Sequence, residues 1–189
     1  MAKVEILIEG YVIKEDKGER ASSTVVLVQD KDINIIIDPG MVKETLAAAL
    51  RKVDLKPEDI HYVLLTHYHP DHALGAVWFP KAKILDSEEV YEDDRISRHD
   101  GFIPATELAI MHTPGHSPEH CSLAVPTDKG MVVIAGDVFW WDDKEEQKID
   151  LNHPDEYAQD QKLLTESREK VLKLADFVIP GHGRIFKVK

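Results

Sequence analysis

Short apolar runs separated by polar turns dominate the first forty residues. The segments 4–13, 23–28 and 33–37 are rich in β-branched residues, and the polar turn 30–32 divides the last two. Runs of this length bounded by turn residues predict β-strands, and so short a turn between two of them favours antiparallel pairing. We therefore expect the chain to open with an antiparallel sheet.

Beyond residue 40, helical and extended patterns alternate. Leu46 and Leu50 recur at helical spacing within 43–52, a short helix is expected over 87–93, and 155–174 is the longest helical candidate. The core-facing side chains of that longest helix are expected to be Tyr157, Leu163, Leu164, Val171 and Leu174. Further strands are expected over residues 61–66, 83–85, 107–112, 121–125 and 131–135. Alternating elements of this kind predict a layered α/β protein.

Length and composition fit one compact domain over residues 1–189. A chain of this size can bury about 70% of the surface that its unfolded form exposes, so disulfides are not needed. Cys121 is the single cysteine, which excludes an internal disulfide and predicts a small buried side chain in a reducing compartment. No stretch approaches the roughly 18 apolar residues of a membrane span, so a cytoplasmic protein without membrane contact is expected.

The formal net charge of −12 bears on possible partners. It makes a broad nucleic-acid surface unfavourable and leaves a small-molecule substrate as the expected partner. Trp140 and Trp141 are adjacent. Their place in the sequence fits a pocket wall, core packing or a subunit contact, so a homo-oligomer stays open.

The densest cluster of metal-binding side chains directly follows the apolar run 63–65. It consists of His67, His69, Asp71 and His72. Three imidazoles this close repel one another when protonated and are costly to bury unpaired, so a divalent cation is their natural stabiliser. A surface histidine cluster is the alternative. The first hypothesis is therefore a metal site.

Three later strand-to-loop junctions carry further residues of the same kind. Pro114-Gly115-His116, Gly136-Asp137 and Pro180-Gly181-His182 each follow an apolar run. Glycine permits a tight turn that brings the polar side chain off a strand end, where sites of layered α/β proteins usually lie. Four such junctions in order strengthen the metal hypothesis.

This pattern resembles the metallo-β-lactamase superfamily, whose motif H-x-H-x-D-H is followed by a distant His, Asp and His. The resemblance implies an αββα sandwich, with two mixed β-sheets flanked by helices. It also implies that His67, His69 and His116 bind one metal ion, that Asp71, His72 and His182 bind a second, and that Asp137 bridges both. Asp38 matches an early Asp-x-Gly element that supports the ligands, and His120 is a second candidate for such support.

Within the superfamily, segments 136–139, 167–176 and 178–183 are similar to the small single-domain group of metallo-β-lactamase domain-containing protein 1. This narrower resemblance implies an RNA phosphodiesterase as an alternative activity. A mononuclear iron persulfide dioxygenase and a non-catalytic, metal-stabilised protein are two further alternatives. A serine triad is disfavoured, because Ser117 and Ser122 lack a nucleophile elbow.

A metallohydrolase with two divalent ions is the leading expectation. Zinc is the default metal for hydrolysis, while iron and manganese also suit imidazole and carboxylate ligands. Two such ions make a hydroxide available near neutral pH, and Asp71 and Asp137 are the expected catalytic carboxylates. The expected substrate is a small ester, thioester, lactone or phosphodiester. Its specificity is expected to lie in the loops 41–42, 95–102 and 139–152.

Overall fold

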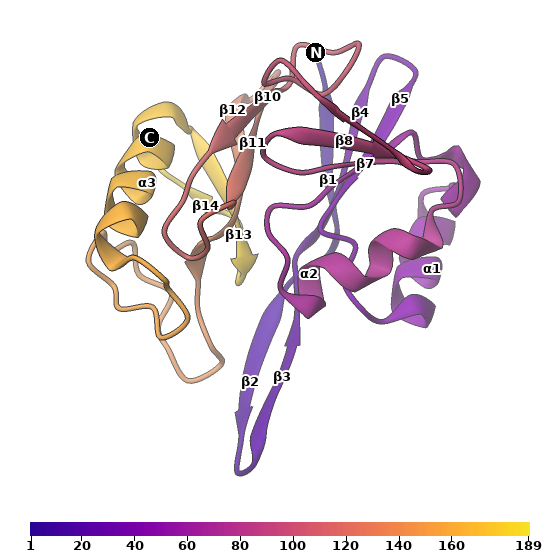
Figure 1. The fold of residues 1–189 in the computed structure, drawn as a ribbon. Coiled ribbons are helices and arrows are strands. Elements are labelled where there is room, and N and C mark those ends of the chain that lie inside the picture. The colour runs from indigo at the N-terminus through magenta and orange to yellow at the C-terminus, as the bar shows by residue number, and fades with distance from the viewer.

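The computed structural model describes residues 1–189 and contains two large β-sheets. The first has seven strands in the order β1-β4-β5-β6-β7-β8-β9 (Figure 1). Their bounds are Lys3–Ile8 (β1), Val25–Asp30 (β4), Ile33–Ile37 (β5), Tyr62–Leu64 (β6), Lys83–Leu85 (β7), Glu89–Glu92 (β8) and Arg95–Arg98 (β9). Strands β1, β4 and β5 pair antiparallel, which confirms the expected opening sheet, whereas β5, β6 and β7 run parallel.

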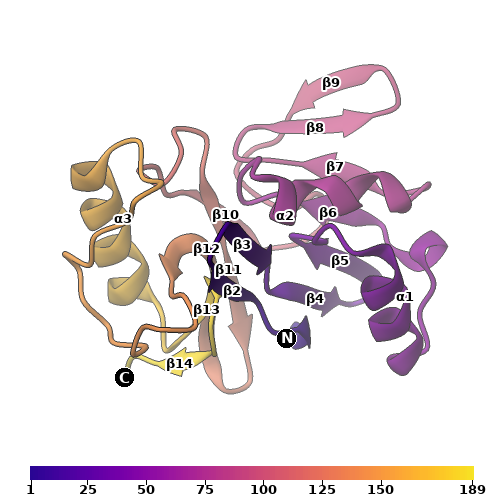
Figure 2. The same cartoon turned by 90° about the horizontal axis from the view of Figure 1, so that it is seen from below.

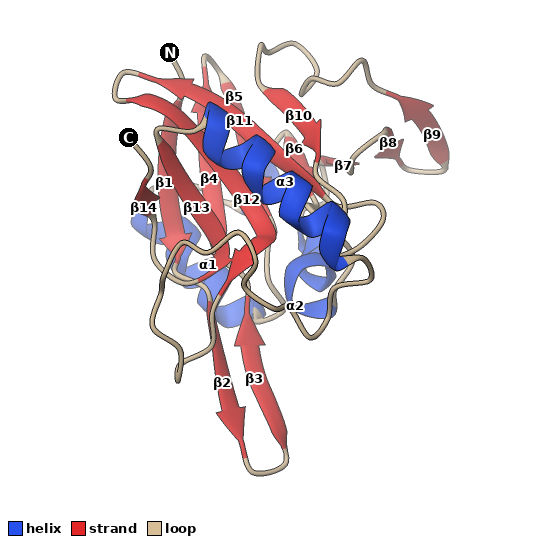
Figure 3. Ribbon diagram, turned by 90° about the vertical axis from the view of Figure 1, so that its left-hand side faces the viewer, coloured by secondary structure: helices blue, strands red, loops and turns tan.

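The second sheet has five strands in the order β10-β11-β12-β13-β14. They are Ala109–His112 (β10), Cys121–Thr127 (β11), Gly130–Trp140 (β12), Phe177–His182 (β13) and Phe186–Lys187 (β14). A separate hairpin, formed by β2 (Tyr11–Glu15) and β3 (Gly18–Ser22), belongs to neither sheet and projects from the molecule (Figure 3).

Helices cover the outer faces of the two sheets, as the view from below shows (Figure 2). The first sheet is covered by α1 (Lys43–Lys52), α2 (Pro70–Ala73) and the 3-10 helices η1 (Pro57–Asp59) and η2 (Leu74–Trp78), and the second by α3 (Gln161–Leu174). This is the expected αββα arrangement. None of the helices has the length and apolar content required to cross a bilayer.

Alternating side chains explain the layers. In β5, Ile35 and Ile37 join the core between the sheets, whereas Ile36 joins the core beneath α1. In β12, Ile134 faces the central core and Val133 faces α3. Successive strand residues point to opposite faces, so strands that are apolar throughout can be covered on both sides.

The predicted helix over 87–93 is wrong, because this segment contains β8. The backbone N–H groups of Glu88 and Glu89 donate to the Asp86 carboxylate and form a turn, after which Val90 and Tyr91 pair with β7. Strand pairing thus overrides a weak helical pattern.

The helix predicted over 155–174 begins only at Gln161, because the Asp160 side chain accepts from Lys162 N and Leu163 N as an N-cap. This start turns Leu164, Ser167, Arg168 and Val171 inward. The predicted core positions Leu164 and Val171 are confirmed, whereas Tyr157, Leu163 and Leu174 are exposed.

The expected strand 4–13 is divided at Gly10, between β1 and β2. Gly10 N donates to Thr24 Oγ1 at 3.0 Å, and Thr24 N donates to Gly181 O at 2.7 Å. A Cβ at Gly10 would lie 2.2 Å from Gly181 O, so only glycine fits here. These bonds form a seam that joins the two halves of the sandwich beside the functional site.

Candidate metal centre

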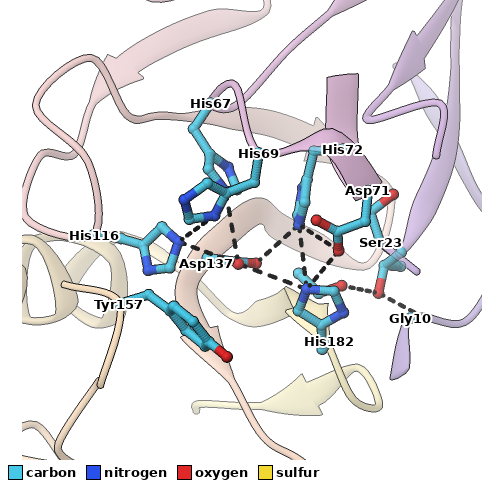
Figure 4. Close-up of polar contacts among 12 residues, drawn as sticks. Gly10, Ser23, His67, His69, Asp71, His72, His116, Asp137, Tyr157 and His182 are labelled. Carbon is cyan, nitrogen blue, oxygen red and sulfur yellow. Dashed lines mark hydrogen bonds and ion pairs between the residues drawn. The ribbon is translucent and has the colours of Figure 1, made fainter. Parts of the chain in front are cut away.

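Seven side chains meet at one end of the sandwich in two groups (Figure 4). We call them the ligand cluster: His67, His69, Asp71, His72, His116, Asp137 and His182. The first group contains His67, His69, His116 and Asp137, and its donor atoms lie within 4.8 Å of one another. The loop after β6 supplies two of these histidines, and the loop after β10 supplies the third.

The second group contains Asp71, His72 and His182, with the same spacing between donor atoms. Asp71 and His72 lie in α2, which begins at Pro70, a residue suited to the first turn of a helix. His182 is the last residue of β13. Its Nε2 lies 3.2 Å from His72 Nε2 and 3.3 Å from Asp71 Oδ2.

Asp137 lies between the two groups, within β12. Its Oδ2 is 3.4 Å from His116 Nε2 and its Oδ1 is 3.3 Å from His72 Nε2. Its backbone N–H donates to His120 Nε2 at 3.1 Å. A Cβ at residue 181 would lie 1.8 Å from Asp137 Oδ1, so Gly181 is required for this carboxylate to fit. The position is the one that a bridging ligand needs.

Three ligand histidines have fixed orientations because their Nδ1 atoms face acceptors. His72 Nδ1 donates to Asp38 Oδ2 at 2.8 Å, and His116 Nδ1 donates to Asp155 Oδ2 at 2.7 Å. His182 Nδ1 donates to the backbone carbonyl of Ser22 at 2.9 Å. In their neutral form all three rings therefore present an unprotonated Nε2 to the cluster, which is the state that binds metal.

Asp38 does more than orient His72. It also accepts from the backbone N–H and the hydroxyl of Thr66, at 2.8 and 2.7 Å, which fixes the start of the ligand loop. Its φ of +49° is a conformation that Asn and Asp tolerate better than most residues. Asp38 thus contacts both His72 and the start of the loop that carries His67 and His69.

His120 is fully buried, and burial, together with nearby His116, lowers its pKa to about 3. It is therefore neutral, with Nδ1 bonded to Thr113 Oγ1 at 3.0 Å and Nε2 accepting from Asp137 N. Thr113 in turn contacts Ser122 Oγ at 2.9 Å. This chain of bonds holds the backbone of Asp137.

Burial and neighbouring charges shift the pKa values of the cluster histidines in opposite directions. Burial lowers the pKa of His67 well below its ordinary value, and His72 lowers it further. Burial also opposes protonation of His72, but Asp137 and Asp38 raise its pKa well above the ordinary value. For Asp137, His72 and His182 outweigh burial and hold the pKa of the carboxyl well below its usual range. The carboxylates thus create a field that attracts cations.

The donor set fits divalent ions. His72 Nε2 and His182 Nε2 face each other at 3.2 Å, although each ring already donates through Nδ1. Opposed lone pairs repel unless a proton or a cation lies between them. Two further buried atoms, His67 Nε2 and Asp137 Oδ1, have no hydrogen-bond partner, an arrangement that costs about 1–3 kcal/mol each. Cations in the two groups would satisfy all four atoms.

A cleft of about 210 Å³ opens onto the cluster. Besides four of the ligands it is lined by Val12, Glu19, Ala21, Pro70, Trp140 and Tyr157. Larger hollows of about 670 and 850 Å³ lie elsewhere and contain none of the seven ligands. The small cleft is therefore the one that serves this chemistry.

The loops expected to control specificity are only partly involved. Trp140, from the segment 139–152, walls the cleft, whereas Trp141 packs in the core beneath α3. The segment 95–102 lines the separate 670 Å³ hollow, and 41–42 does not line the cleft. Residues of the β2–β3 hairpin line the cleft in place of those loops. No pattern in the sequence indicated these hairpin residues. Asp155, the partner of His116, was also missed.

His61 and His112 lie outside the cluster. His61 Nδ1 accepts from Asn34 N, and His112 contacts the carbonyl of Pro118. Cys121 is buried and unpaired, as predicted.

Comparison with known proteins agrees with this geometry. The family model of the metallo-beta-lactamase superfamily matches residues 18–109. Metallo-beta-lactamase domain-containing protein 1 of Xenopus laevis is 32% identical, over 98% of this chain and 81% of the relative. An N-acyl homoserine lactonase of Bacillus cereus is 30% identical, over 59% of this chain and 52% of the lactonase.

Solved structures share the fold. A candidate metallo-beta-lactamase from Thermotoga maritima superimposes with a TM-score of 0.73 at 23% identity, covering 98% of this chain and 99% of that one. The dizinc quorum-quenching lactonase AidC gives 0.65 at 20% identity, over 87% and 73% of the two chains. With the Xenopus relative aligned over 98% of this chain and 81% of its own length, the chain belongs to the metallo-beta-lactamase superfamily.

Proposed function

We propose that this protein is a dinuclear zinc hydrolase of a small ester, thioester, lactone or phosphodiester. The observation that carries the proposal is the sharing of Asp137 between two groups of donor atoms at the base of an open cleft. His67, His69 and His116 would hold one ion, Asp71, His72 and His182 the other, and Asp137 both. Lactonases among the similar proteins, one of them a dizinc enzyme, support hydrolysis and zinc.

Bound divalent ions supply a water of lowered pKa and polarise the bond under attack. The chain's own residues hold the ions and manage protons. Asp71 is the more exposed of the two central carboxylates, with 15% of its side chain accessible against 6% for Asp137. Because it also lines the cleft, Asp71 is positioned to accept a proton from the incoming nucleophile. Asp137 is buried and is suited to holding the two groups together.

The test is elemental analysis of the purified protein, followed by assays of a carboxylic ester, a thioester, a lactone and a phosphodiester. About two zinc ions per chain and metal-dependent turnover of one substrate are the expected results. His116→Ala should remove turnover, whereas His112→Ala, at the end of β10 but outside the cluster, should not.

Other results would point to the alternative activities. One iron per chain without hydrolysis would redirect the search to a persulfide dioxygenase. A chelator-dependent fall in melting temperature without any turnover would indicate a non-catalytic metal protein. Cleavage of RNA, but of none of the small substrates, would favour the RNA phosphodiesterase.

A further inference from the structure

The β2–β3 hairpin lines one side of the cleft. None of the hairpin residues that line it belongs to the ligand cluster. Val12 of β2 and Glu19 and Ala21 of β3 line the cleft opposite the ligand cluster. This hairpin pairs with neither large sheet, and one backbone bond, from Asp143 N to Val12 O at 2.9 Å, joins β2 to the segment after β12; side-chain contacts add to it. The hairpin residues that line the cleft are therefore available to select the substrate.

A polar group at the mouth of the cleft ties the hairpin to the segment before α3. The hydroxyl of Tyr157 donates to the Glu19 carboxylate, with both oxygens at 2.9 Å. Lys14 Nζ lies 3.2 Å from Glu19 Oε2 and also pairs with Glu156. On the same strand, Lys14 N donates to Asp143 Oδ1 at 3.1 Å. These contacts fix Glu19 at the rim.

The charges of this group do not cancel. One ammonium, that of Lys14, faces the two carboxylates of Glu19 and Glu156, so the group carries one net negative charge. Glu19 lines the cleft, whereas Lys14 and Glu156 do not. An anion in the cleft therefore lies close to the Glu19 carboxylate, and the chain's overall charge of −12 adds to the repulsion.

The remaining lining is apolar and aromatic. Val12, Ala21, Pro70, Trp140 and Tyr157 form the walls, and the rings of Trp140 and Tyr157 lie 5.7 Å apart. Walls of this kind bind alkyl or aryl groups and offer an anion no positive charge. The volume of about 210 Å³ admits only a small group.

We infer that the substrate is an uncharged acyl compound, an ester, thioester or lactone with a short apolar arm, and that Glu19 is a specificity-determining residue that disfavours phosphodiesters. This inference rests on the proposed hydrolase function and narrows it. The ligand cluster alone would accept both acyl compounds and phosphodiesters. Glu19 is the side chain that distinguishes between these two classes.

The first test compares two chromogenic substrates with the metal-loaded protein: p-nitrophenyl butyrate, which is neutral, and bis(p-nitrophenyl) phosphate, which is an anion. The measured quantity is the ratio of kcat/KM for the phosphodiester to kcat/KM for the ester. Glu19→Gln keeps a hydrogen-bond acceptor for Tyr157 but removes the charge, so it should raise this ratio by about fivefold. An unchanged or lower ratio would overturn the inference.

Two further variants separate charge from disturbance of the hairpin. Lys14→Gln removes the ammonium that lies 3.2 Å from Glu19 Oε2 and partly neutralises the carboxylate lining the cleft, so it should move the ratio in the opposite direction, downward by about fivefold. Glu156→Gln is the matched control, because Glu156 pairs with the same lysine but does not line the cleft, and it should leave the ratio within about twofold. Equal changes for Glu19→Gln and Glu156→Gln would assign the effect to surface charge and contradict a role of Glu19.

A binding measurement separates this inference from the proposed activity. Isothermal titration of the metal-loaded protein with diethyl phosphate, an anion, and triethyl phosphate, a neutral compound of similar shape, requires no turnover. Glu19→Gln should tighten binding of the anion about fivefold and leave the neutral compound within about twofold. If hydrolysis of every substrate fails but this difference is found, the proposed function is wrong and the charge selection stands. Turnover without the difference would reject the charge selection alone.

Discussion

The ligand cluster and the β2–β3 hairpin both border the cleft. They differ in burial and in the contacts that hold them in place. His67, His72 and His116 are at most 1% exposed, and Asp38 and Asp155 orient the last two through buried bonds of 2.8 and 2.7 Å. The hairpin is held by Lys14, Glu19 and Glu156, whose side chains are 24%, 32% and 60% exposed.

This difference has an energetic meaning. Buried hydrogen bonds to charged groups are worth about 1.5–3 kcal/mol each, whereas exposed ion pairs contribute about 0–1 kcal/mol. The positions of the ligands are therefore fixed by buried bonds, one of which joins His182 to the carbonyl of Ser22 at the end of β3. The exposed ion pairs of Lys14 can change with little effect on the cluster. Substitutions in these ion pairs would then alter substrate selection separately from the chemistry of the ligand cluster.

The largest effect should follow from removing the shared ligand. Asp137→Ala takes a donor from both groups, so turnover should fall by about a thousandfold and the zinc content should drop. Asp142→Ala, on the exposed loop after β12, is the matched control and should leave both values near those of the unmodified protein. Retention of two zinc ions and full turnover by Asp137→Ala would show that Asp137 is not a ligand.

A smaller effect is expected from the residues that orient the ligands. Asp38→Asn keeps the size of the side chain but weakens its acceptance from His72 and Thr66, so zinc affinity should fall about 10–100-fold. Competition with a chelator measures this change. Asp155→Asn should act similarly through His116, and an unchanged affinity in both variants would contradict fixation of the ligands by the fold.

Asp86 supports the ligand loop from outside the cluster, and this support should depend on pH. Its carboxylate accepts from Tyr68, which lies between two ligands, and from Tyr91, Glu88 N and Glu89 N. Burial opposes ionisation, but these donors, Tyr68 first, lower the pKa of Asp86 below its ordinary value.

Because the folded-state pKa is depressed, this stabilisation is present above the unfolded value of about 3.9 and is lost as the pH falls through the folded value. At pH 7, Asp86→Asn should lower the free energy of unfolding of the metal-free protein by about 1–2 kcal/mol. The difference from the unmodified protein should shrink below about pH 4. A constant difference over the whole pH range would contradict this role, and denaturant unfolding measures it.

The smallest effect should come from the hairpin. Lys14→Met removes both ion pairs, so the free energy of unfolding should change by less than about 1 kcal/mol and zinc affinity by less than about twofold. Lys162→Met, which removes an exposed pair on α3, provides the comparison. A tenfold loss of zinc affinity in Lys14→Met would show that the hairpin and the ligand cluster are coupled.

Local signals explain what the sequence could predict. The loop 67–72 and the glycine turns before His116, Asp137 and His182 are short motifs, so all seven candidate ligands could be named, and the structure brings them together. The layers were predictable because most strands are apolar at successive positions and the long helices are periodic.

What the sequence could not predict depends on distant contacts. The pairing of Tyr157 with Glu19 spans 138 residues, and that of His116 with Asp155 spans 39. Tyr157 was expected in the core, but the Asp160 cap delays the helix and leaves Tyr157 at the mouth of the cleft. The segment 87–93 contains a strand because β7 and β9 are both available for pairing. Neither spacing nor composition encodes such partners.

The seam at Thr24 also sets an order for assembly. It joins residues 157 positions apart, and contacts of such separation form slowly during folding. Four of the ligands lie within residues 67–72 and are available as soon as that loop exists, whereas His182 reaches His72 across 110 positions. Zinc present during refolding therefore meets these four of the seven cluster residues first. Binding of zinc to residues 67–72 would compete with formation of the contact between Thr24 and Gly181. Adding metal after refolding should therefore give a higher yield of active protein than adding it before.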